Sequence, residues 1–218
     1  DLYFLWLSRM ISFRSQVQQG GIFLAGAILM VLSLAVLCGW WADIGLLKSV
    51  IDGFPEMKPA GAGGFFLVGL AFVFSSYSHR TKRFRWLSIV SGGIIAAGGA
   101  AVLLAYVFQI SIPIDAALIP NLGPGSTHSR VSPVSAVNFI FLGVSLILAK
   151  WRGLGHLSGV LTTFVVAAAY TSLLGHLYGA NTFYGFSGIN GMPLHTAFLF
   201  IAAGVALLGE NREFPLVE

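Results

Sequence analysis

Two histidines, His176 and His195, are the residues of this sequence best suited to chemistry. Imidazole is a ligand of haem iron, and an ionisable side chain inside an apolar segment usually has a function. His176 lies near the end of one apolar segment and His195 at the start of the next, so a helical hairpin would bring both rings to a similar depth. One interpretation is a bis-histidine haem site. The other, which we prefer, is that both rings hydrogen-bond backbone carbonyl groups where a loop folds back, and that no metal is bound.

Other polar residues extend this candidate site. Asn138, Tyr178 and Thr196 are expected near the same ends of their apolar segments as the histidines. Polar side chains in lipid usually hydrogen-bond between helices, at about 0.6 kcal/mol each. The alternative is a shallow pocket, open to the outer face of a membrane, that binds an amphiphile. The candidate ligand-binding set is His176, His195, Asn138, Tyr178 and Thr196.

No combination of residues in the sequence predicts catalysis. A glycine-rich phosphate loop, a cysteine pair and a Ser-His-Asp set are all absent, and Cys38 is the single cysteine. We therefore expect neither a disulfide framework nor an enzyme. No cofactor is predicted, although the alternatives leave haem or a pigment open.

The composition places these residues in a membrane. Of 218 residues, 56% are hydrophobic and 9% are charged, against about 25% charged residues in an average soluble domain. A helix needs about 20 apolar residues to cross a hydrocarbon core of roughly 30 Å. Six segments approach or exceed that length without an Asp, Glu, Lys or Arg: 20–41, 60–78, 86–109, 134–149, 155–178 and 194–208.

The basic residues predict how these segments are oriented. Nine of the twelve lie before the first segment, after the last, or in the connections between the second and third and between the fourth and fifth. Basic residues collect on the cytoplasmic side, so both termini are expected in the cytoplasm. The net charge of +4 is thus a signal of membrane orientation, and the basic surface that nucleic-acid binding needs is missing.

The sequence divides into a membrane domain with two short flanks. Residues 1–19 mix aromatic and aliphatic residues with two arginines, which suits an amphipathic helix on the cytoplasmic membrane face. The alternative is that they only extend the first span. Residues 20–209 form the six-span domain, and 210–218 form a cytoplasmic tail.

The pattern Ala-x2-Phe-x3-Gly occurs three times. The copies start at Ala62, Ala136 and Ala197, each just after a proline that suits the first turn of a helix. They predict three αα-hairpin repeats, about 20–78, 86–149 and 155–208, in which the repeated residues serve packing. Spans 86–109 and 155–178 are rich in small residues, which permit close helix approach. We therefore expect these two spans at the centre of the bundle.

The repeats carry a resemblance to a known class of membrane region. The segments "RVSPVSAVNFIFLGVSLILAK" and "GMPLHTAFLFIAAGVALLGENREF" resemble stretches in the six-helix N-terminal membrane region of bacterial sensor histidine kinases and diguanylate cyclases. The resemblance covers about residues 20 to 214. The first copy differs from the related stretches, because "AGAGG" stands where they have Asn-Thr-Ala. The sequence as far as Glu218 contains no kinase, cyclase or PAS sequence.

These observations lead to one expectation for function and one main alternative. The fold class is an all-α, polytopic membrane bundle of six transmembrane helices, in the bacterial inner membrane. The resemblance implies a sensory input module that relays an outer-leaflet or periplasmic stimulus to a cytoplasmic partner or output domain. The alternative is a non-catalytic accessory subunit of a photosynthetic or respiratory membrane complex. A haem-binding protein or a carrier is ranked below both. Expected partners are the lipid bilayer, other membrane proteins or a cytoplasmic signalling domain, without nucleic acid.

Overall fold

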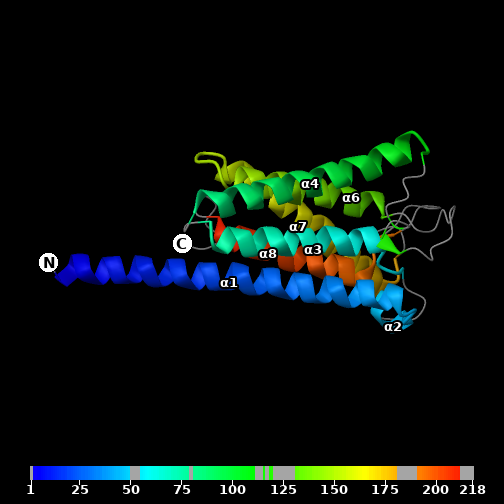
Figure 1. Ribbon diagram of the computed structural model, residues 1–218, viewed down its shortest axis with the longest axis horizontal. Helices are drawn as coiled ribbons and strands as arrows, with labels where there is room; N and C mark the ends of the chain where they lie inside the picture. Colours follow the sequence, from blue (N-terminus) through cyan, green and yellow to red (C-terminus); the bar gives the residue numbers. More distant parts are fainter. Residues whose placement is uncertain are drawn as a thin grey trace.

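The computed structural model describes residues 2–49, 55–78, 81–110, 115, 118–119, 131–180 and 191–211, with side chains from Gln18 onward. Helices are the regular secondary structure of this described part, and no strand occurs in it. Figure 1 shows them as a bundle of roughly parallel and antiparallel rods. The helices are α1 (Leu2–Trp41), α2 (Gly45–Lys48), α3 (Pro59–Ser76), α4 (Lys82–Val107), α6 (Pro133–Leu148), α7 (Gly155–Tyr178) and α8 (Leu194–Glu210).

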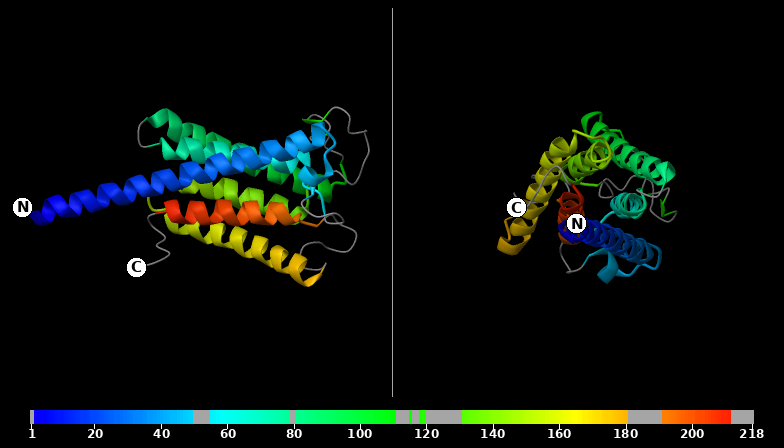
Figure 2. Two further views of the ribbon diagram at one scale, coloured as in Figure 1. Left: turned by 90° about the horizontal axis from the view of Figure 1, so that it is seen from below. Right: turned by 90° about the vertical axis from the view of Figure 1, so that its left-hand side faces the viewer.

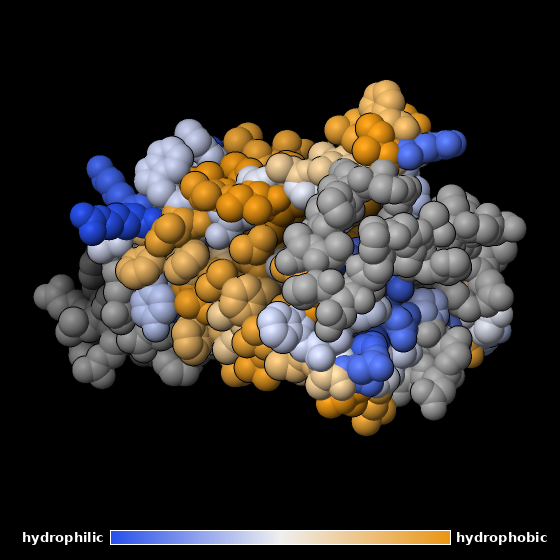
Figure 3. Space-filling view, turned by 45° about the vertical axis from the view of Figure 1, so that its right-hand side comes forward, coloured by the Kyte–Doolittle hydropathy of each residue, from blue (hydrophilic) through white to orange (hydrophobic). Residues whose placement is uncertain are grey.

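Four of these helices are long and apolar enough to cross a membrane. They are the Gln18–Trp41 part of α1 together with α3, α4 and α7. Helices α6 and α8 are equally apolar in character but have only 16 and 17 residues. On one face, hydrophobic residues cover the middle of the bundle and hydrophilic ones lie toward its ends (Figure 3). The chain is therefore an integral membrane protein built as a helical bundle.

Two helix boundaries differ from the predicted spans in a way that charge explains. Helix α4 begins at Lys82 rather than at residue 86, and α8 continues to Glu210 rather than ending at 208. The predicted spans contain no charged residues because a charged side chain is energetically costly in hydrocarbon. A helix can nevertheless continue into the headgroup region, where water and polar lipid groups solvate such side chains.

Proline and extended N-cap residues fix where the repeated helices begin. Pro59 and Pro133 occupy the first turn of α3 and α6, where the missing N–H costs no hydrogen bond. The Ser132 hydroxyl accepts a hydrogen bond from the Ser135 N–H at 3.2 Å. Helix α7 ends at Tyr178, and the next residue, Gly179, has a φ of 65°, a left-handed conformation that glycine adopts without strain.

Helices α3, α6 and α8 form the interior, and α1, α4 and α7 surround them (Figure 2, right). Of its most apolar 18-residue window, α3 buries 56%, whereas α1 and α4 each bury 28% and α7 buries 33%. The expectation that spans 86–109 and 155–178 lie at the centre was wrong. The small residues of α4 allow contact with one neighbour, α6, while Val90 and Ile94 on α4 remain exposed.

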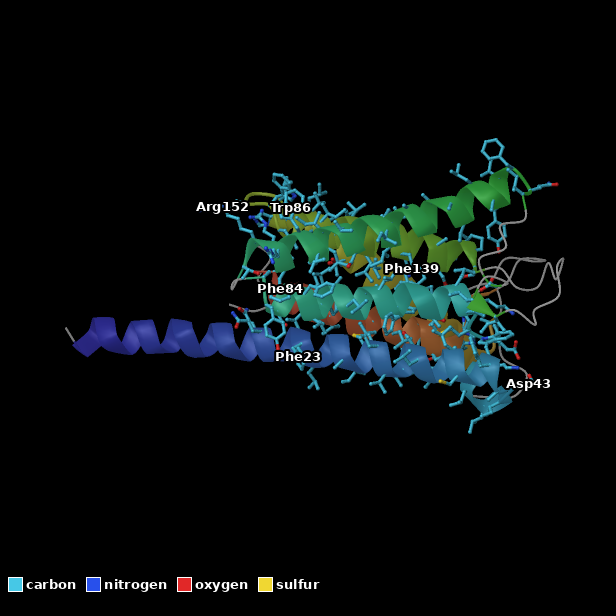
Figure 4. The ribbon with its side chains drawn as sticks, viewed as in Figure 1. Phe23, Asp43, Phe84, Trp86, Phe139 and Arg152 are labelled. Atoms are coloured by element: carbon cyan, nitrogen blue, oxygen red, sulfur yellow. The ribbon has the colours of Figure 1, made fainter. Side chains whose placement is uncertain are left out.

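The repeated phenylalanines meet at the centre of the interior. The ring centroids of Phe65 and Phe139 are 4.9 Å apart, those of Phe65 and Phe200 4.6 Å, and those of Phe139 and Phe200 4.8 Å. Each ring is buried, and each pair is tilted or edge to face, the geometry that aromatic quadrupoles favour. Figure 4 shows Phe139 in the middle of the bundle. The three rings therefore join α3, α6 and α8.

The repeated glycines join each inner helix to one outer helix. A Cβ added at Gly69 would lie 2.7 Å from the Gly26 carbonyl oxygen of α1, and one at Gly143 would lie 2.5 Å from the Gly92 oxygen of α4. In α8, a Cβ at Gly204 would lie 2.3 Å from a methyl group of Val166 in α7. The most extensive helix contacts accordingly pair α1 with α3, α4 with α6, and α7 with α8.

An aromatic series links the first two of these pairs. Tyr77, just after α3, lies edge to face with Phe23 of α1, with ring centroids 6.1 Å apart. Its ring also contacts Phe84 of α4, with centroids 5.7 Å apart. Phe23 and Phe84 face each other across the end of α3 in Figure 4. These rings therefore connect α1, the end of α3 and the start of α4.

Helix α1 is longer than the bundle that it packs against. Its 40 residues correspond to about 60 Å at 1.5 Å per residue. Figure 1 shows its N-terminal part continuing beyond the other helices, at the end where α8 finishes. Helix α1 is continuous through residues 2–19, the segment for which a separate helix on the membrane face or an extension of the first span was expected. We call the end of the bundle where α8 finishes the Glu210 end, and the opposite end, where α1 finishes, the Trp41 end.

The central rings make a direct prediction about stability. Replacing Phe200 with Ala should lower the free energy of unfolding by about 3 kcal/mol, the lower end of the range for such core truncations, because transfer from lipid contributes little. Phe198 lies on the same helix but is 53% exposed, so Phe198→Ala should change stability little. Thermal unfolding in detergent compares the two variants, and equal losses would contradict a central role for the three rings.

The close helix approach makes a second prediction. Gly92→Ala places a Cβ 2.8 Å from the Gly143 oxygen, whereas Gly93→Ala meets no atom within 4 Å. The first change should cost about 1–3 kcal/mol through overpacking, and the second should be neutral. Denaturant titration of the two purified variants measures the difference. A stability of Gly92→Ala equal to that of Gly93→Ala would show that α4 and α6 do not approach as closely as described.

Candidate functional site

The two histidines lie near each other at the Trp41 end. His176, in the last turn of α7, is 7% exposed, and its Nε2 lies 2.8 Å from the carbonyl oxygen of Met192. His195 is the second residue of α8, close enough to His176 for their charges to interact. Its Nε2 is buried and has no hydrogen-bond partner among the described residues. The His176 hydrogen bond joins the end of α7 to the residue before Pro193, so it fixes the start of α8.

The other predicted site residues are spread over different surroundings. Asn138 and Thr196 are buried, whereas Tyr178 is 82% exposed. Thr196 lines a cavity of about 60 Å³ together with Ser135, Lys58 and other residues, but neither histidine, Asn138 nor Tyr178 lines it. The structure therefore brings His176 and His195 together, and neither of them lines the cavity that contains Thr196.

The structure shows the predicted backbone hydrogen bond for one of the two histidines, His176. Either ring nitrogen of a histidine can bind iron, but Nε2 of His176 is used by the Met192 carbonyl. The structural alternative predicts such a bond for both rings, but Nε2 of His195 has no partner among the described residues. The choice between the two alternatives stays a prediction.

A tryptophan between two lysines organises the chain after α1. The ammonium groups of Lys48 and Lys58 lie 4.9 Å and 5.6 Å from the ring centroid of Trp40, within cation–π range. The Trp40 Nε1 donates a hydrogen bond to the Met57 carbonyl oxygen at 2.8 Å, and Lys48 pairs with Asp43. These contacts hold α2 and the segment before α3 against the end of α1.

A carboxylate from a distant segment caps α3. The Ala60 N–H donates to Oδ1 of Asp115 at 2.7 Å, across 55 positions of sequence. Burial raises the pKa of the Asp115 carboxyl group, and the hydrogen bond from Ala60 and the charge of Lys58 oppose that rise. Burial likewise lowers the pKa of the Lys58 ammonium, against the charges of Glu56 and Asp115. The start of α3 therefore depends on a partly desolvated carboxylate.

A polar cluster at the Glu210 end was missed in the sequence. Nζ of Lys150 lies 2.9 Å from Oε1 of Glu210, and the Ser75 hydroxyl hydrogen-bonds to both groups. The Lys150 side chain is only 7% exposed and that of Glu210 22%. The cluster connects α3, the turn after α6, and the last residue of α8. Sequence reasoning took Lys150 as a sign of orientation and placed Glu210 in a tail, although the position of Glu210 directly after an apolar run was a usable signal.

Further hydrogen bonds hold the end of α8. The Asn211 side chain donates to the Gly155 carbonyl oxygen at 2.6 Å, which joins α8 to the start of α7. The Gln18 side chain donates to the Gly209 oxygen at 3.3 Å, which joins α8 to α1. Together with Glu210, these contacts connect the end of α8 to α1, α3, α7 and the turn after α6.

A cavity of about 370 Å³ opens beside this cluster. Its cationic lining residues are Arg85, Lys150 and Arg152, and Glu210 is its one carboxylate among the described lining residues. Side chains of α1 and of the α3–α4 connection complete it. This cavity is large enough for a small ligand, and it lies at the opposite end of the bundle from the predicted site.

The chain matches no known family model, no curated protein and no solved structure.

The Asp115 cap predicts a pH dependence of stability. Because burial raises the folded-state pKa of Asp115 above its ordinary value of 3.8, the folded state holds the proton more tightly than the unfolded state. The contribution of this group is fully present below about pH 4 and is lost as the pH rises through the raised pKa. Asp115→Asn keeps an oxygen acceptor without titrating, so its stability relative to the original chain should increase between pH 4 and 7.

Thermal unfolding at the two pH values measures this effect. Asp115→Ala, which also removes the acceptor for the Ala60 N–H, should be less stable than Asp115→Asn by about 1 kcal/mol at both. The same difference between Asp115→Asn and the original chain at pH 4 and pH 7 would contradict the raised pKa.

Proposed function

We propose that this protein is a membrane-embedded input module that converts a stimulus at the Trp41 end into a movement of α8 at the Glu210 end. The observation that carries the proposal is the placement of α8. Its first turn contributes Thr196 to the cavity at the Trp41 end, and its last residue, Glu210, belongs to the polar cluster at the other end. A single helix between two polar sites can transmit a displacement because its backbone hydrogen bonds make it rigid.

In this proposal all six apolar helices cross the membrane as three hairpins. Helices α6 and α8 are short, but α1, α4 and α7 surround them, so their ends contact protein more than lipid. Elements that are buried in protein need not match the bilayer thickness. The Glu210 end is cytoplasmic, since Arg85, Lys150 and Arg152 lie there and basic residues collect on that side. The membrane is the bacterial inner membrane.

The ion pair of Lys150 and Glu210 would hold α8 in one of two positions. A stimulus acts by binding one arrangement of the bundle more tightly than the other, which shifts their populations. The resemblance of the repeats to the membrane regions of sensor kinases and cyclases supports this role. The chain itself acts without catalysis and passes the movement to a cytoplasmic partner or output domain.

A fusion protein tests both the orientation of the chain in the membrane and the coupling of the bundle to an output domain. A diguanylate cyclase domain is joined after residue 214 of the full membrane region, and the cyclic dinucleotide is measured in intact cells. Product forms only if the junction lies in the cytoplasm, where the nucleotide substrate is. Glu210→Gln breaks the ion pair and should change the output severalfold, because losing about 1.4 kcal/mol from one state changes a two-state ratio tenfold.

Lys82→Gln is the matched control, because it also removes one charge near the membrane surface but Lys82 is exposed and lies outside the cluster. It should leave the output unchanged. Equal output from Glu210→Gln, the control and the original fusion, at equal protein levels, would contradict the coupling. Purification of the native protein with stoichiometric membrane partners instead would favour an accessory subunit.

A further inference from the structure

We propose that the cavity at the Glu210 end binds a phosphate group, carried either by an anionic membrane lipid or by a soluble phosphate ester. This inference does not rest on a signalling role, because it concerns binding alone. It starts from the content of the cavity, in which three cationic side chains face one carboxylate among the described lining residues. The volume of about 370 Å³ lies within the usual range for ligand sites.

The positive charge of this cavity is not neutralised within the described residues. Glu210 pairs with Lys150, so that carboxylate balances one cation. Arg85 uses its Nη2 to hydrogen-bond the Lys150 carbonyl oxygen, and its guanidinium lies 6.0 Å from the centroid of the Trp151 ring. Arg85 and Arg152 form no ion pair with any described acidic residue. Two guanidinium charges therefore remain at the mouth of the cavity.

The donors in the cavity match the chemistry of phosphate. Guanidinium groups present planar N–H forks that bind phosphate oxygens in pairs. Ser78 and Gln19 line the same cavity and add neutral hydrogen-bonding groups. A divalent cation would be repelled by the two arginines, and a purely apolar molecule would leave these donors without acceptors. A phosphate group satisfies both the charge and the donors.

The cavity also lies at the depth where lipid phosphates occur. Trp151 lines it and is 51% exposed, and Trp86, next to Arg85 in sequence, is 58% exposed. Exposed tryptophans in membrane proteins mark the headgroup level. Figure 4 shows Arg152 and Trp86 close together at this end, opposite Asp43. Basic pockets between helices on the cytoplasmic side are known to bind anionic headgroups.

The test is binding to the full chain, purified in a neutral detergent. Its probes are dioleoyl phosphatidic acid, dioleoylglycerol as the lipid without phosphate, and glycerol 3-phosphate and inorganic phosphate as soluble sources. Native mass spectrometry counts bound molecules, and a thermal shift titration gives apparent affinities. We expect phosphatidic acid to bind at one molecule per chain and to raise the melting temperature, with no effect of dioleoylglycerol.

The arginines are tested by charge-neutralising variants. Arg85→Gln combined with Arg152→Gln should weaken phosphatidic acid binding at least about tenfold, since each basic side chain near an anionic surface contributes appreciably. The matched control is Lys82→Gln combined with Arg83→Gln, which removes the same charge from exposed positions of α4 that do not line the cavity. Arg152→Gln alone serves if the double variant misfolds, because Arg152 forms no ion pair within the described part of the chain and its loss breaks none.

The outcomes distinguish a lipid phosphate from a soluble phosphate, and they distinguish both from a cavity that binds no phosphate group. Binding of phosphatidic acid that soluble phosphates do not displace supports a lipid headgroup. Binding of glycerol 3-phosphate or inorganic phosphate that competes with the lipid supports a soluble phosphate ester. The proposal is overturned if no phosphate-bearing probe binds, or if the control pair weakens binding as much as the two arginines do.

Discussion

The contact of Phe65, Phe139 and Phe200 is the interaction on which the arrangement of the helices depends. These rings come from three separate helices, and each lies within 5 Å of the other two, measured between centroids. In lipid, apolar surface alone does not drive helices together, so shape and close packing must do so. Three interlocking rings supply such packing, and they place α3, α6 and α8 around one point.

Each inner helix packs against one outer helix through its repeated glycine. The backbones of α3 and α1, and of α6 and α4, approach so closely that a methyl group would overlap a carbonyl oxygen. At these contacts the two backbones touch directly, and the small dispersion attractions between their many atoms add up. The outer helices keep their large apolar side chains, such as Leu24 and Phe164, exposed to the surroundings. The same short motif thus determines both the centre and the pairing.

The two ends of the bundle use polar groups differently. At the Trp41 end, Asp115 and His176 satisfy backbone groups and fix where α3 and α8 begin. At the Glu210 end, charged side chains from several segments meet around Lys150, beside a cavity with excess positive charge. Helix α8 is the element common to both ends. Our proposal for signal relay follows from the position of α8 between the two ends. Our proposal for phosphate binding follows from the Glu210 end, which keeps cationic groups available to a ligand.

The sequence by itself determined the membrane environment, the approximate helices and the three Ala-x2-Phe-x3-Gly motifs, because hydropathy, proline position and small-residue spacing are local along the chain. It did not determine which helices are central, since the small residues of α4 serve one contact and not two. Nor did it show that Ser75 meets Glu210, 135 positions away, or that Tyr178 is exposed while Thr196 is buried. Those relations arise only when helices pack, because packing sets the rotation of each helix and therefore which of its side chains meet.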